Sequence, residues 1–311
     1  MDQVSSPSPS TQSTPAPLGR VVQLGAAAVS KSKALGLHGG IRADAPVLVV
    51  LAAGIGKRFG QAPKCIQDVC GRPLARHSID NFRSFSDSPV VCVIGYRHEE
   101  VSRALGEDVV YVLSSNAVGG TAMAAYEACG APGLMEADPL LVITMGDRII
   151  PTAVFRQLCD AHRGGPKEAG LTFLTALYEP DRLRGKGRII RDGDGRVIGI
   201  VEEKDILAEP DPARRATLLA SNEGNCPLYA IRARTLVQHL RDVTNANSQG
   251  QYYLTDIVQS IRRDGGDIRT VATTPGDNEY RVLCADVTRP ADLAALAGVL
   301  QKGSRYTPAP P

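Results

Sequence analysis

Tryptophan is absent from the 311-residue chain, and aromatic residues make up only 5% of it. The core therefore has to be mostly aliphatic. Hydrophobic residues make up 43% of the chain, which is enough for a sizeable core. No stretch approaches the roughly 18 consecutive apolar residues of a membrane-spanning helix, so no membrane partner is expected. Proteins that bind a phosphate backbone usually carry a strong basic patch, and a net charge of +2 argues against nucleic acid as the main partner.

Cysteine pairs of the Cys-x-x-Cys type are missing as well. An odd number of scattered cysteines argues against a disulfide framework or a structural zinc site. A reducing cytoplasm is therefore the expected location. The seven cysteines are Cys65, Cys70, Cys92, Cys129, Cys159, Cys226 and Cys284.

Acidic residues are missing between Gln3 and Arg42, where four lysines and arginines occur. This composition is weakly similar to an organelle transit peptide, but Val21–Val29 is too short and too rich in glycine and alanine for a secretory signal. The first 19 residues are rich in serine, proline and threonine and cannot bury enough apolar surface to become ordered. We predict a disordered N-terminal arm over residues 1–45.

Apolar runs alternate with helix-compatible segments through the first half of the chain. Val47–Leu51 is a continuous aliphatic run with β-branched valines, which is typical of a strand buried on both faces. Further strands are expected at Val90–Ile94, Val109–Leu113 and Leu140–Met145, and helices at Pro73–Phe85, His98–Leu105 and Thr121–Cys129. This alternation predicts an α/β fold with a mostly parallel central sheet and helices on both faces.

The pattern changes after Pro151. Asp192–Gly195 has the composition of a hairpin turn between two short strands. Strands are expected at Leu171–Tyr178, Gly187–Arg191, Val197–Val201, Leu228–Ile231 and Arg281–Cys284, and helices at Tyr253–Arg263 and Ala291–Leu300. The length allows two domains or one large α/β domain. We predict one folded domain over residues 46–302 and a disordered tail over residues 303–311.

A loop rich in small residues, Leu51–Lys64, follows the first strand. Small residues let backbone N–H groups approach an anion closely and form a nest for phosphate oxygens. Arg58 and Lys64 would add charge that spreads over a triphosphate. A simple glycine turn with solvated basic side chains is the alternative. The small residues are Ala52, Ala53, Gly54 and Gly56.

Asp147 follows Gly146 at the end of the Leu140–Met145 run. This position corresponds to the carboxyl edge of the predicted sheet, where open α/β folds bind their ligands. We predict that Asp147 is a ligand of Mg²⁺.

The string LAAGIGKRFGQAPK, followed by Gly71–Leu74, closely resembles the opening signature of the sugar-1-phosphate nucleotidyltransferase family. Its glycine spacing differs from that of the Rossmann and Walker patterns. Gly187–Ile189, Gly199–Asp205 and Gln249–Ile257 resemble, in the same order, the uridylyltransferase domain of N-acetylglucosamine-1-phosphate uridylyltransferases. The resemblance implies a Rossmann-like nucleotidyltransferase fold with a small β-rich sugar-binding part.

The resemblance also implies roles for individual residues. A carboxylate and an amide suit sugar hydroxyls and an N-acetyl group, since buried polar ligand atoms need specific partners. Taken singly, Glu202 would sooner be interpreted as a surface strand residue and Tyr252 as a core residue, so the implied roles depend on the ordered set. The implied nucleotide-binding residues are Leu51, Ala52, Ala53, Gly54, Gly56, Ser115, Asn116, Gly120 and Thr121, and the implied sugar-binding residues are Gly187, Glu202, Asn225, Tyr252 and Tyr253.

A second metal carboxylate is implied at Asp286. The run from Asp286 to Leu293 resembles the Asp-x-x-Thr-Pro-x-Asp-Leu element in which many relatives carry this group. Two aspartates suffice for Mg²⁺, which completes its octahedron with water and phosphate oxygens. The alternative is that Asp286 caps the last helix, a role for which Asp292 competes.

Two strings depart from the family pattern. Ser114–Thr121 stands where the family usually has glutamines that read uracil, and Glu223–Pro227 replaces a pattern of the Asn-Thr-Gly type. The reaction expected from the resemblance joins UTP to N-acetylglucosamine-1-phosphate with release of pyrophosphate. A CTP- or other NTP-using transferase acting on a different phosphorylated small molecule is the alternative. Outside the enzymes, the alternative is a catalytically silent nucleotide-sugar sensor.

Overall fold

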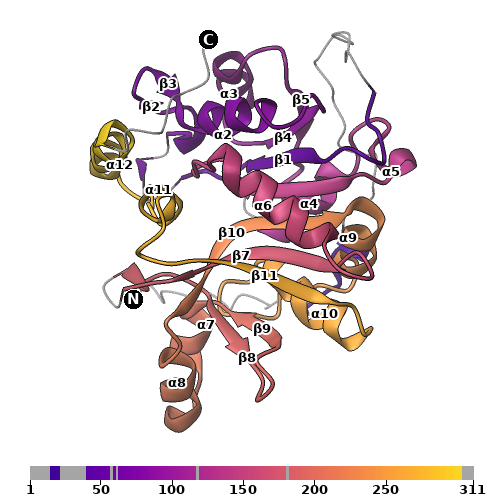
Figure 1. Cartoon of the computed structure of the whole chain (residues 1–311), viewed down its shortest axis with the longest axis vertical. Coiled ribbons are helices and arrows are strands. Elements are labelled where there is room, and N and C mark those ends of the chain that lie inside the picture. The colour runs from indigo at the N-terminus through magenta and orange to yellow at the C-terminus, as the bar shows by residue number, and fades with distance from the viewer. Residues whose placement is uncertain are drawn as a thin grey trace, which may run out of the picture.

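The computed structural model describes residues 15–21, 40–56, 59–60, 62–116, 119–179 and 182–302. Within these residues the centre is a nine-stranded sheet, seven strands of which follow the order β11-β7-β10-β6-β1-β4-β5 (Figure 1). The seven strands are β1 (Val47–Ala52), β4 (Val90–Ile94), β5 (Val110–Leu113), β6 (Leu140–Met145), β7 (Leu171–Leu177), β10 (Glu223–Arg232) and β11 (Ile268–Thr273). β1 pairs in parallel with β4 and β6, and β10 lies antiparallel between β6 and β7. The predicted mostly parallel sheet is therefore confirmed.

Helices cover both faces of the sheet because its central strands are apolar on both sides. In β1, Val49 and Leu51 belong to one hydrophobic cluster, whereas Leu48 and Val50 belong to another. The first cluster includes residues of α4 (Thr121–Ala128), α9 (Ala233–Leu240) and α10 (Ile257–Arg263), and the second includes residues of α2 (Leu74–Arg83), α3 (His98–Leu105) and α6 (Thr152–Arg163). α2, α3, α4 and α10 match predicted helices, whereas α6 and α9 were not predicted. A 3₁₀ turn, η4 (Leu254–Asp256), precedes α10.

A small β-rich unit extends from the main sheet, as the resemblance implied. Its hairpin consists of β8 (Arg188–Arg191) and β9 (Val197–Val201), and β8 joins the sheet where Arg188 pairs with Gly224 of β10. Asp192 Oδ1 closes the turn by accepting hydrogen bonds from the backbone N–H groups of Asp194 and Arg196. In Figure 1 this hairpin lies with α7 (Glu203–Ala208) and α8 (Pro212–Leu219) at the end of the molecule opposite α2 and α3.

The expected strand at Arg281–Cys284 is wrong, because this segment is part of a short helix, α11 (Tyr280–Leu283). Tyr280 and Leu283 are three residues apart and both are buried, a spacing that places them on one face of a helix. A short apolar run does not by itself distinguish a strand from a helix. The last strand of the sheet is instead β11, which pairs in parallel with β7. The predicted final helix is present as α12 (Pro290–Lys302).

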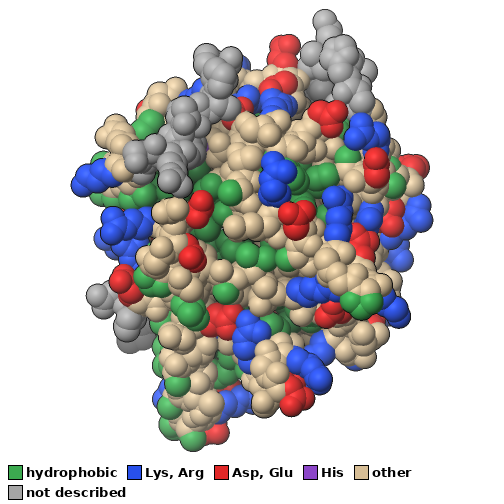
Figure 2. Space-filling view, viewed as in Figure 1, with side chains coloured by type: hydrophobic (Ala, Val, Ile, Leu, Met, Phe, Trp, Pro, Cys, Tyr) green, Lys and Arg blue, Asp and Glu red, His purple; other side chains and the backbone are tan. Residues whose placement is uncertain are grey.

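Smaller elements complete the described part. They are α1 (Leu18–Val21), η2 (Lys64–Ile66), the two-stranded sheet of β2 (Asp68–Val69) and β3 (Arg72–Pro73), and α5 (Leu134–Ala137). None of the helices among the described residues has the length and apolarity needed to cross a bilayer. On the face shown in Figure 2, acidic and basic side chains are interspersed over the surface.

Part of the predicted N-terminal arm packs against the domain. Leu18 is fully buried, and its backbone N–H donates to the carbonyl oxygen of Val243. Residues 15–21 and 40–45 are thus exceptions to the disorder predicted for residues 1–45. Packing of this one apolar side chain in the domain's hydrophobic cluster holds a segment that composition alone would not order. The predicted tail, residues 303–311, lies outside the described residues.

Candidate active site

The candidate phosphate loop leaves the carboxyl end of β1. Leu51 and Ala52 are the last residues of the strand, and the loop ends at the 3₁₀ turn that Lys64 begins. Gly56 has a φ of +67°, and a Cβ atom there would lie 2.9 Å from the Ala62 carbonyl oxygen, so glycine is required. Gly54 is exposed, and a Cβ atom on it would meet nothing within 4 Å. Ala53 is buried beside them, and the predicted catalytic Arg58 lies outside the described residues.

Lys64 and Asp147 form an ion pair at this edge of the sheet. Asp147 follows β6, the parallel neighbour of β1, and both side chains of the pair are 25% exposed. Lys64 Nζ also donates to the backbone oxygen of Val287 at 3.1 Å. Burial alone would raise the pKa of Asp147, but the charges of Lys64 and Arg148 outweigh it and hold this pKa below its ordinary value. Asp147 is therefore an anion at neutral pH.

Asp286 lies beside this pair, although it does not follow a strand as expected. It comes from the connection between α11 and α12, directly before Val287. Arg148 Nη2 donates to its Oδ1 atom at 2.7 Å, and Lys186 Nζ donates to the same atom. Burial would raise the pKa of Asp286, but these two cations hold it below its ordinary value. The charges of Asp286 and Asp147 also act on each other, and Lys64 contacts the residue after Asp286.

The capping role proposed as an alternative for Asp286 belongs to Asp292. Its Oδ2 atom accepts from the backbone N–H groups of Thr288 and Arg289, both at 2.7 Å, and from the Thr288 hydroxyl at 3.0 Å. A carboxylate in the first turn of α12 that binds the preceding N–H groups satisfies donors that the helix leaves unpaired. Asp286 is left available for another role.

The residues present fit a magnesium ion. Among the described residues, neither Oδ1 of Asp147 nor Oδ2 of Asp286 accepts a hydrogen bond. No group of three or more His, Cys, Asp and Glu side chains in the described ranges could hold a metal. Magnesium, however, commonly takes only one or two protein carboxylates and fills its remaining positions with water and phosphate oxygens.

Arg148 and Lys186 are members of this cluster that sequence reasoning missed. Lys186 is only 5% exposed, and its ammonium group also lies 5.2 Å from the centre of the Tyr178 ring. Arg148 Nη1 donates to the Ala285 carbonyl at 3.0 Å, which fixes the segment that carries Asp286. The adjacency of Arg148 to Asp147 was a usable signal. No sequence pattern placed Lys186 against a residue 100 positions away.

The predicted base-binding loop follows β5, and Glu127 of α4 holds it. Ser115 donates to Glu127 Oε1 with its backbone N–H, at 2.9 Å, and with its hydroxyl. Ser115 and Asn116 are exposed, as residues that contact a base need to be. Glu127 is only 3% exposed and was not predicted.

Gly120 and Thr121 stand at the start of α4, next to Tyr252. Gly120 has a φ of +101°, and a Cβ atom there would collide with the Tyr252 backbone. The Tyr252 N–H donates to Gly119 O at 3.0 Å, and its carbonyl oxygen accepts from Ala122 N at 2.9 Å. Thr121 Oγ1 accepts from Leu254 N at 2.9 Å. The predicted nucleotide-binding turn and the predicted sugar-binding segment are therefore bonded to each other.

Three of the predicted sugar-binding residues lie together. A Cβ atom on Gly187 would lie 3.2 Å from Glu202 Oε1, so the two residues are in contact. Asn225 donates its backbone N–H to Gly187 O at 2.8 Å. Burial raises the pKa of Glu202, and the Thr255 hydroxyl donates to Glu202 Oε1 at 3.3 Å. Thr255 is a member of this cluster that was missed.

The remaining sugar-side residues differ from one another. Asn225 is 7% exposed and donates Nδ2 to the Tyr229 hydroxyl at 2.7 Å, whereas its Oδ1 atom is buried without a partner in the described part of the chain. Burial and the nearby Asp205 and Glu202 charges raise the pKa of Tyr253, which places Tyr253 near the cluster. Tyr252 points elsewhere, because its hydroxyl donates to Ala16 O at 2.9 Å.

Asp256 provides a pH-dependent test of the charges beside the sugar cluster. Burial, Glu202 and Asp205 raise its pKa to about 7. The folded protein therefore holds a proton on Asp256 that the unfolded chain has already released, and stability is lost as pH rises from about 4 to 7. We expect Asp256→Asn to raise Tm by roughly 2–4 °C at pH 8, the shift that about 1 kcal/mol produces in a domain of this size.

The Tm gain in Asp256→Asn should vanish near pH 4, where both states of the wild type are protonated at this position. Thermal unfolding followed by circular dichroism at the two pH values measures the difference. Asp242→Asn, at an exposed position, is the control. An equal gain at both pH values would show that Asp256 titrates normally.

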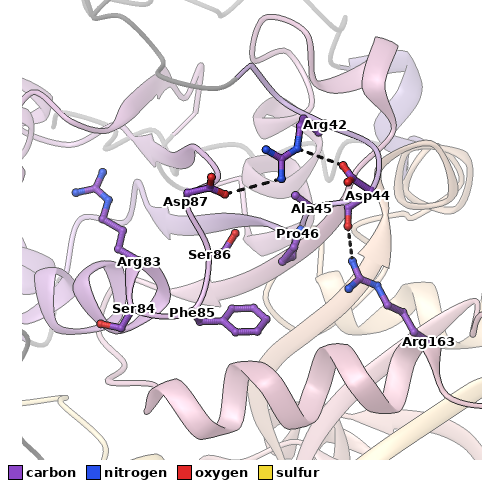
Figure 3. A pocket seen from close by; sticks show the side chains of 10 residues that line it. All are labelled: Arg42, Asp44, Ala45, Pro46, Arg83, Ser84, Phe85, Ser86, Asp87 and Arg163. Carbon is purple, nitrogen blue, oxygen red and sulfur yellow. Dashed lines mark hydrogen bonds and ion pairs between the residues drawn. The ribbon is translucent and has the colours of Figure 1, made fainter.

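A cavity of about 490 Å³ lies at the opposite edge of the sheet (Figure 3). It is lined by the segment before β1, the connection between α2 and β4, and Arg163. Its charged groups are paired: Arg42 with Asp44 and Asp87, and Arg163 with the Asp44 backbone oxygen. Ligands of open α/β sheets bind at the carboxyl ends of the strands, so this cavity is not the candidate active site.

The chain is similar to known proteins over most of its length. The family model described as "MobA-like NTP transferase domain" matches residues 48–298. The bifunctional protein GlmU of Geobacillus thermodenitrificans is 36% identical over 220 residues, which are 70% of this chain and 45% of that protein. The GlmU of Burkholderia mallei strain SAVP1 is 35% identical over 257 residues, 82% of this chain and 52% of that protein. The chain thus spans about half the length of the curated relatives it matches.

Two solved structures share the fold at low sequence identity. A putative glucose-1-phosphate thymidylyltransferase from Bacillus anthracis has a TM-score of 0.61 and 15% identity, with 83% of this chain and 96% of that chain covered. The inositol-1-phosphate CTP transferase from T. maritima has a TM-score of 0.56 and 15% identity, with 86% and 98% covered. These likenesses confirm the Rossmann-like nucleotidyltransferase fold.

Proposed function

Because the chain belongs to the MobA-like NTP transferase domain family, we propose that it is a sugar-1-phosphate nucleotidyltransferase, which makes an NDP-sugar and pyrophosphate. The observation that carries the proposal is the Lys64–Asp147 ion pair at the carboxyl end of β1, with Asp286 beside it. A cation and two anionic carboxylates next to a glycine loop form a site suited to a metal–triphosphate complex.

In the proposed reaction, a phosphate oxygen of the sugar-1-phosphate attacks the α-phosphorus of the NTP. The new P–O bond forms in line with the bond to the leaving pyrophosphate, which departs with its electron pair. Backbone N–H groups of Leu51–Gly56 would hold the phosphates, and Lys64 would place its charge against the α-phosphoryl oxygens. A magnesium ion held by Asp147 and Asp286 would supply further positive charge. Positioning and charge stabilisation account for catalysis without a covalent intermediate.

The proposed substrates are UTP and N-acetylglucosamine-1-phosphate. This choice of substrates rests on the sequence segments that resemble the uridylyltransferase domain and on similarity to proteins named GlmU. The contact between Gly187 and Glu202 and the unpartnered oxygen of Asn225 support a sugar there, since a carboxylate accepts from hydroxyls and an amide oxygen accepts from an N-acetyl N–H. CTP with another phosphorylated compound remains the second candidate, because a neighbour in fold is a CTP transferase.

A panel of four NTPs against several sugar-1-phosphates, read as pyrophosphate release with Mg²⁺ present, tests the proposal. We expect release with one NTP and one sugar phosphate well above all other pairs. Binding of nucleotide without release for every pair would instead support the catalytically silent sensor.

All seven cysteines are free thiols, six of them buried, which supports a reducing compartment such as the cytoplasm.

Ser115 and Asn116 are expected to determine NTP preference. Ser115→Ala removes the hydroxyl that donates to Glu127, and Asn116→Ala removes an exposed amide beside it. Sites that pair with a base edge reject a mismatched base because their polar groups are left unpaired. We expect the ratio of kcat/KM values for UTP and CTP to change by about 10-fold or more, which corresponds to one hydrogen bond of about 1.4 kcal/mol.

Ser102→Ala, at a half-buried serine whose hydroxyl donates to the Glu99 carbonyl, is the control for the NTP-preference measurement. If both loop variants keep the wild-type ratio, the base is read elsewhere.

A further inference from the structure

Residues 15–21, which we call the N-terminal segment, are anchored by a single side chain. Leu18 is the only buried residue among 15–20 and belongs to the same hydrophobic cluster as Val243 and Tyr252. Backbone hydrogen bonds run from Leu18 N to Val243 O at 2.8 Å and from Gly19 N to Arg241 O at 3.1 Å. A Cβ atom on Gly19 would lie 3.1 Å from the Arg241 side chain, so glycine permits this close approach. The anchor therefore depends on one leucine and two amides.

Tyr252 connects this segment to the candidate active site. Its hydroxyl donates to Ala16 O at 2.9 Å, and the residue is 6% exposed. Its backbone N–H and carbonyl oxygen bind Gly119 O and Ala122 N on either side of the Gly120–Thr121 turn. One residue thus contacts the N-terminal segment through its side chain and the turn expected to bind nucleotide through its backbone.

The turn has little freedom to adjust around Tyr252. Gly120 is in the left-handed region, and even one additional carbon on it would collide with the Tyr252 backbone. Tyr252 and the Gly119–Ala122 segment are in van der Waals contact and share two backbone hydrogen bonds. A displacement of Tyr252 therefore has to displace this segment as well. Whatever fixes the Tyr252 side chain also fixes the turn.

We propose that the N-terminal segment is a positioning element for the nucleotide site. Docking of Leu18 and the bond from Tyr252 to Ala16 hold the Gly119–Thr121 turn in the conformation that binds the NTP. The proposal rests on the proposed function for the identity of the ligand. Because coupling between two binding events is reciprocal, bound nucleotide has to stabilise docking of the segment by the same factor by which docking strengthens nucleotide binding.

The first test compares full-length variants. Leu18→Asp places a charge in the buried anchor, and Arg20→Asp places the same charge on an exposed position of the same helix as the matched control. We expect Leu18→Asp to raise the Kd and KM for MgUTP, or for MgCTP if the panel selects it, by about 10-fold, within the usual range of coupling. In Leu18→Asp, turnover at saturating NTP should change less than about 2-fold, because the N-terminal segment acts on the Gly119–Thr121 turn and not on Lys64 or Asp147. Tyr252→Phe should raise KM in the same direction by a smaller factor.

The second test needs no variant. In the wild-type protein, hydrogen exchange of the Leu18 and Gly19 amides should slow when MgUTP or MgCTP binds, because both amides are hydrogen-bonded only in the docked state. Unchanged exchange with nucleotide bound, or wild-type Kd in Leu18→Asp, overturns the inference. Hydrogen exchange is measured with nucleotide alone and needs no sugar phosphate. If no pyrophosphate is released in the substrate panel, the proposed function is contradicted, but the exchange experiment still tests the role of the N-terminal segment.

Discussion

Lys64→Ala is expected to lower kcat by about 10²-fold or more, the usual scale for removing one preorganised group that stabilises developing charge. Lys64 lies at the end of the glycine loop, where a Cβ atom on Gly56 would be 3.6 Å from its Cγ, and it binds both Asp147 and the Val287 carbonyl. Its loss removes positive charge from the α-phosphoryl position and releases Asp147 from its partner. The same effect is expected for Arg58→Ala. Pyrophosphate release at saturating substrates measures both.

The fold should survive Lys64→Ala, because the pair is partly exposed and Asp147 keeps Arg148 as a neighbouring charge. Lys167→Ala, an identical change at an exposed position, is the matched control and should retain wild-type turnover. A Lys64→Ala protein with the control's rate would remove Lys64 from the catalytic machinery.

Asp147→Asn is expected to lower magnesium-dependent turnover by about 10²–10³-fold, because the several kcal/mol of charge stabilisation that a bound metal supplies depend on its carboxylates. Asp286→Asn should have the same direction of effect. Both changes keep the shape of the side chain and remove one negative charge. Titration with Mn²⁺, followed by the loss of the electron paramagnetic resonance signal of the free ion, should show weaker binding in both variants.

Asp292→Asn is the matched control for the metal site, since Asp292 lies six residues from Asp286 and caps α12. This change should reduce stability by about 1 kcal/mol, the usual value for a capping group, without altering Mn²⁺ binding. Full magnesium-dependent activity in Asp286→Asn would leave Asp147 as the only protein ligand. Wild-type Mn²⁺ affinity in Asp147→Asn would contradict the site altogether.

Sequence patterns predicted the sheet well because each central strand is a short, continuous apolar run. Val90–Ile94 and Leu140–Met145 occupy the ranges expected from such runs. Residues that follow such a strand could be placed too, since parallel strands end at the same edge; Asp147 is the example. The prediction of a strand at Arg281–Cys284 was wrong because four residues fit the periodicity of a strand as well as that of a helix. In the folded chain, burial of both Tyr280 and Leu283 favours the helix.

Other members of the site could not be found this way because tertiary contacts select them. Lys186 reaches Asp286 only after the small β-rich unit and the α11–α12 connection have come together. Glu127 is one residue within an alanine-rich helix, and only the position of α4 turns it toward Ser115. Leu18 lies in a segment whose composition indicates disorder, and it is buried only because it packs in the hydrophobic cluster that includes Val243.

The contact of Lys64 with Val287 and that of Arg148 with Asp286 have a consequence for biosynthesis. A ribosome releases the N-terminal strands first, and domains form as the chain emerges. The glycine loop, β6 and all the other described strands of the sheet precede residue 274, whereas the second proposed metal ligand is Asp286. Phe59 of the loop also shares a hydrophobic cluster with Leu296 and Leu300 of α12. A nascent chain can therefore build the whole described sheet and still lack part of the proposed active site until Asp286 and α12 have left the exit tunnel.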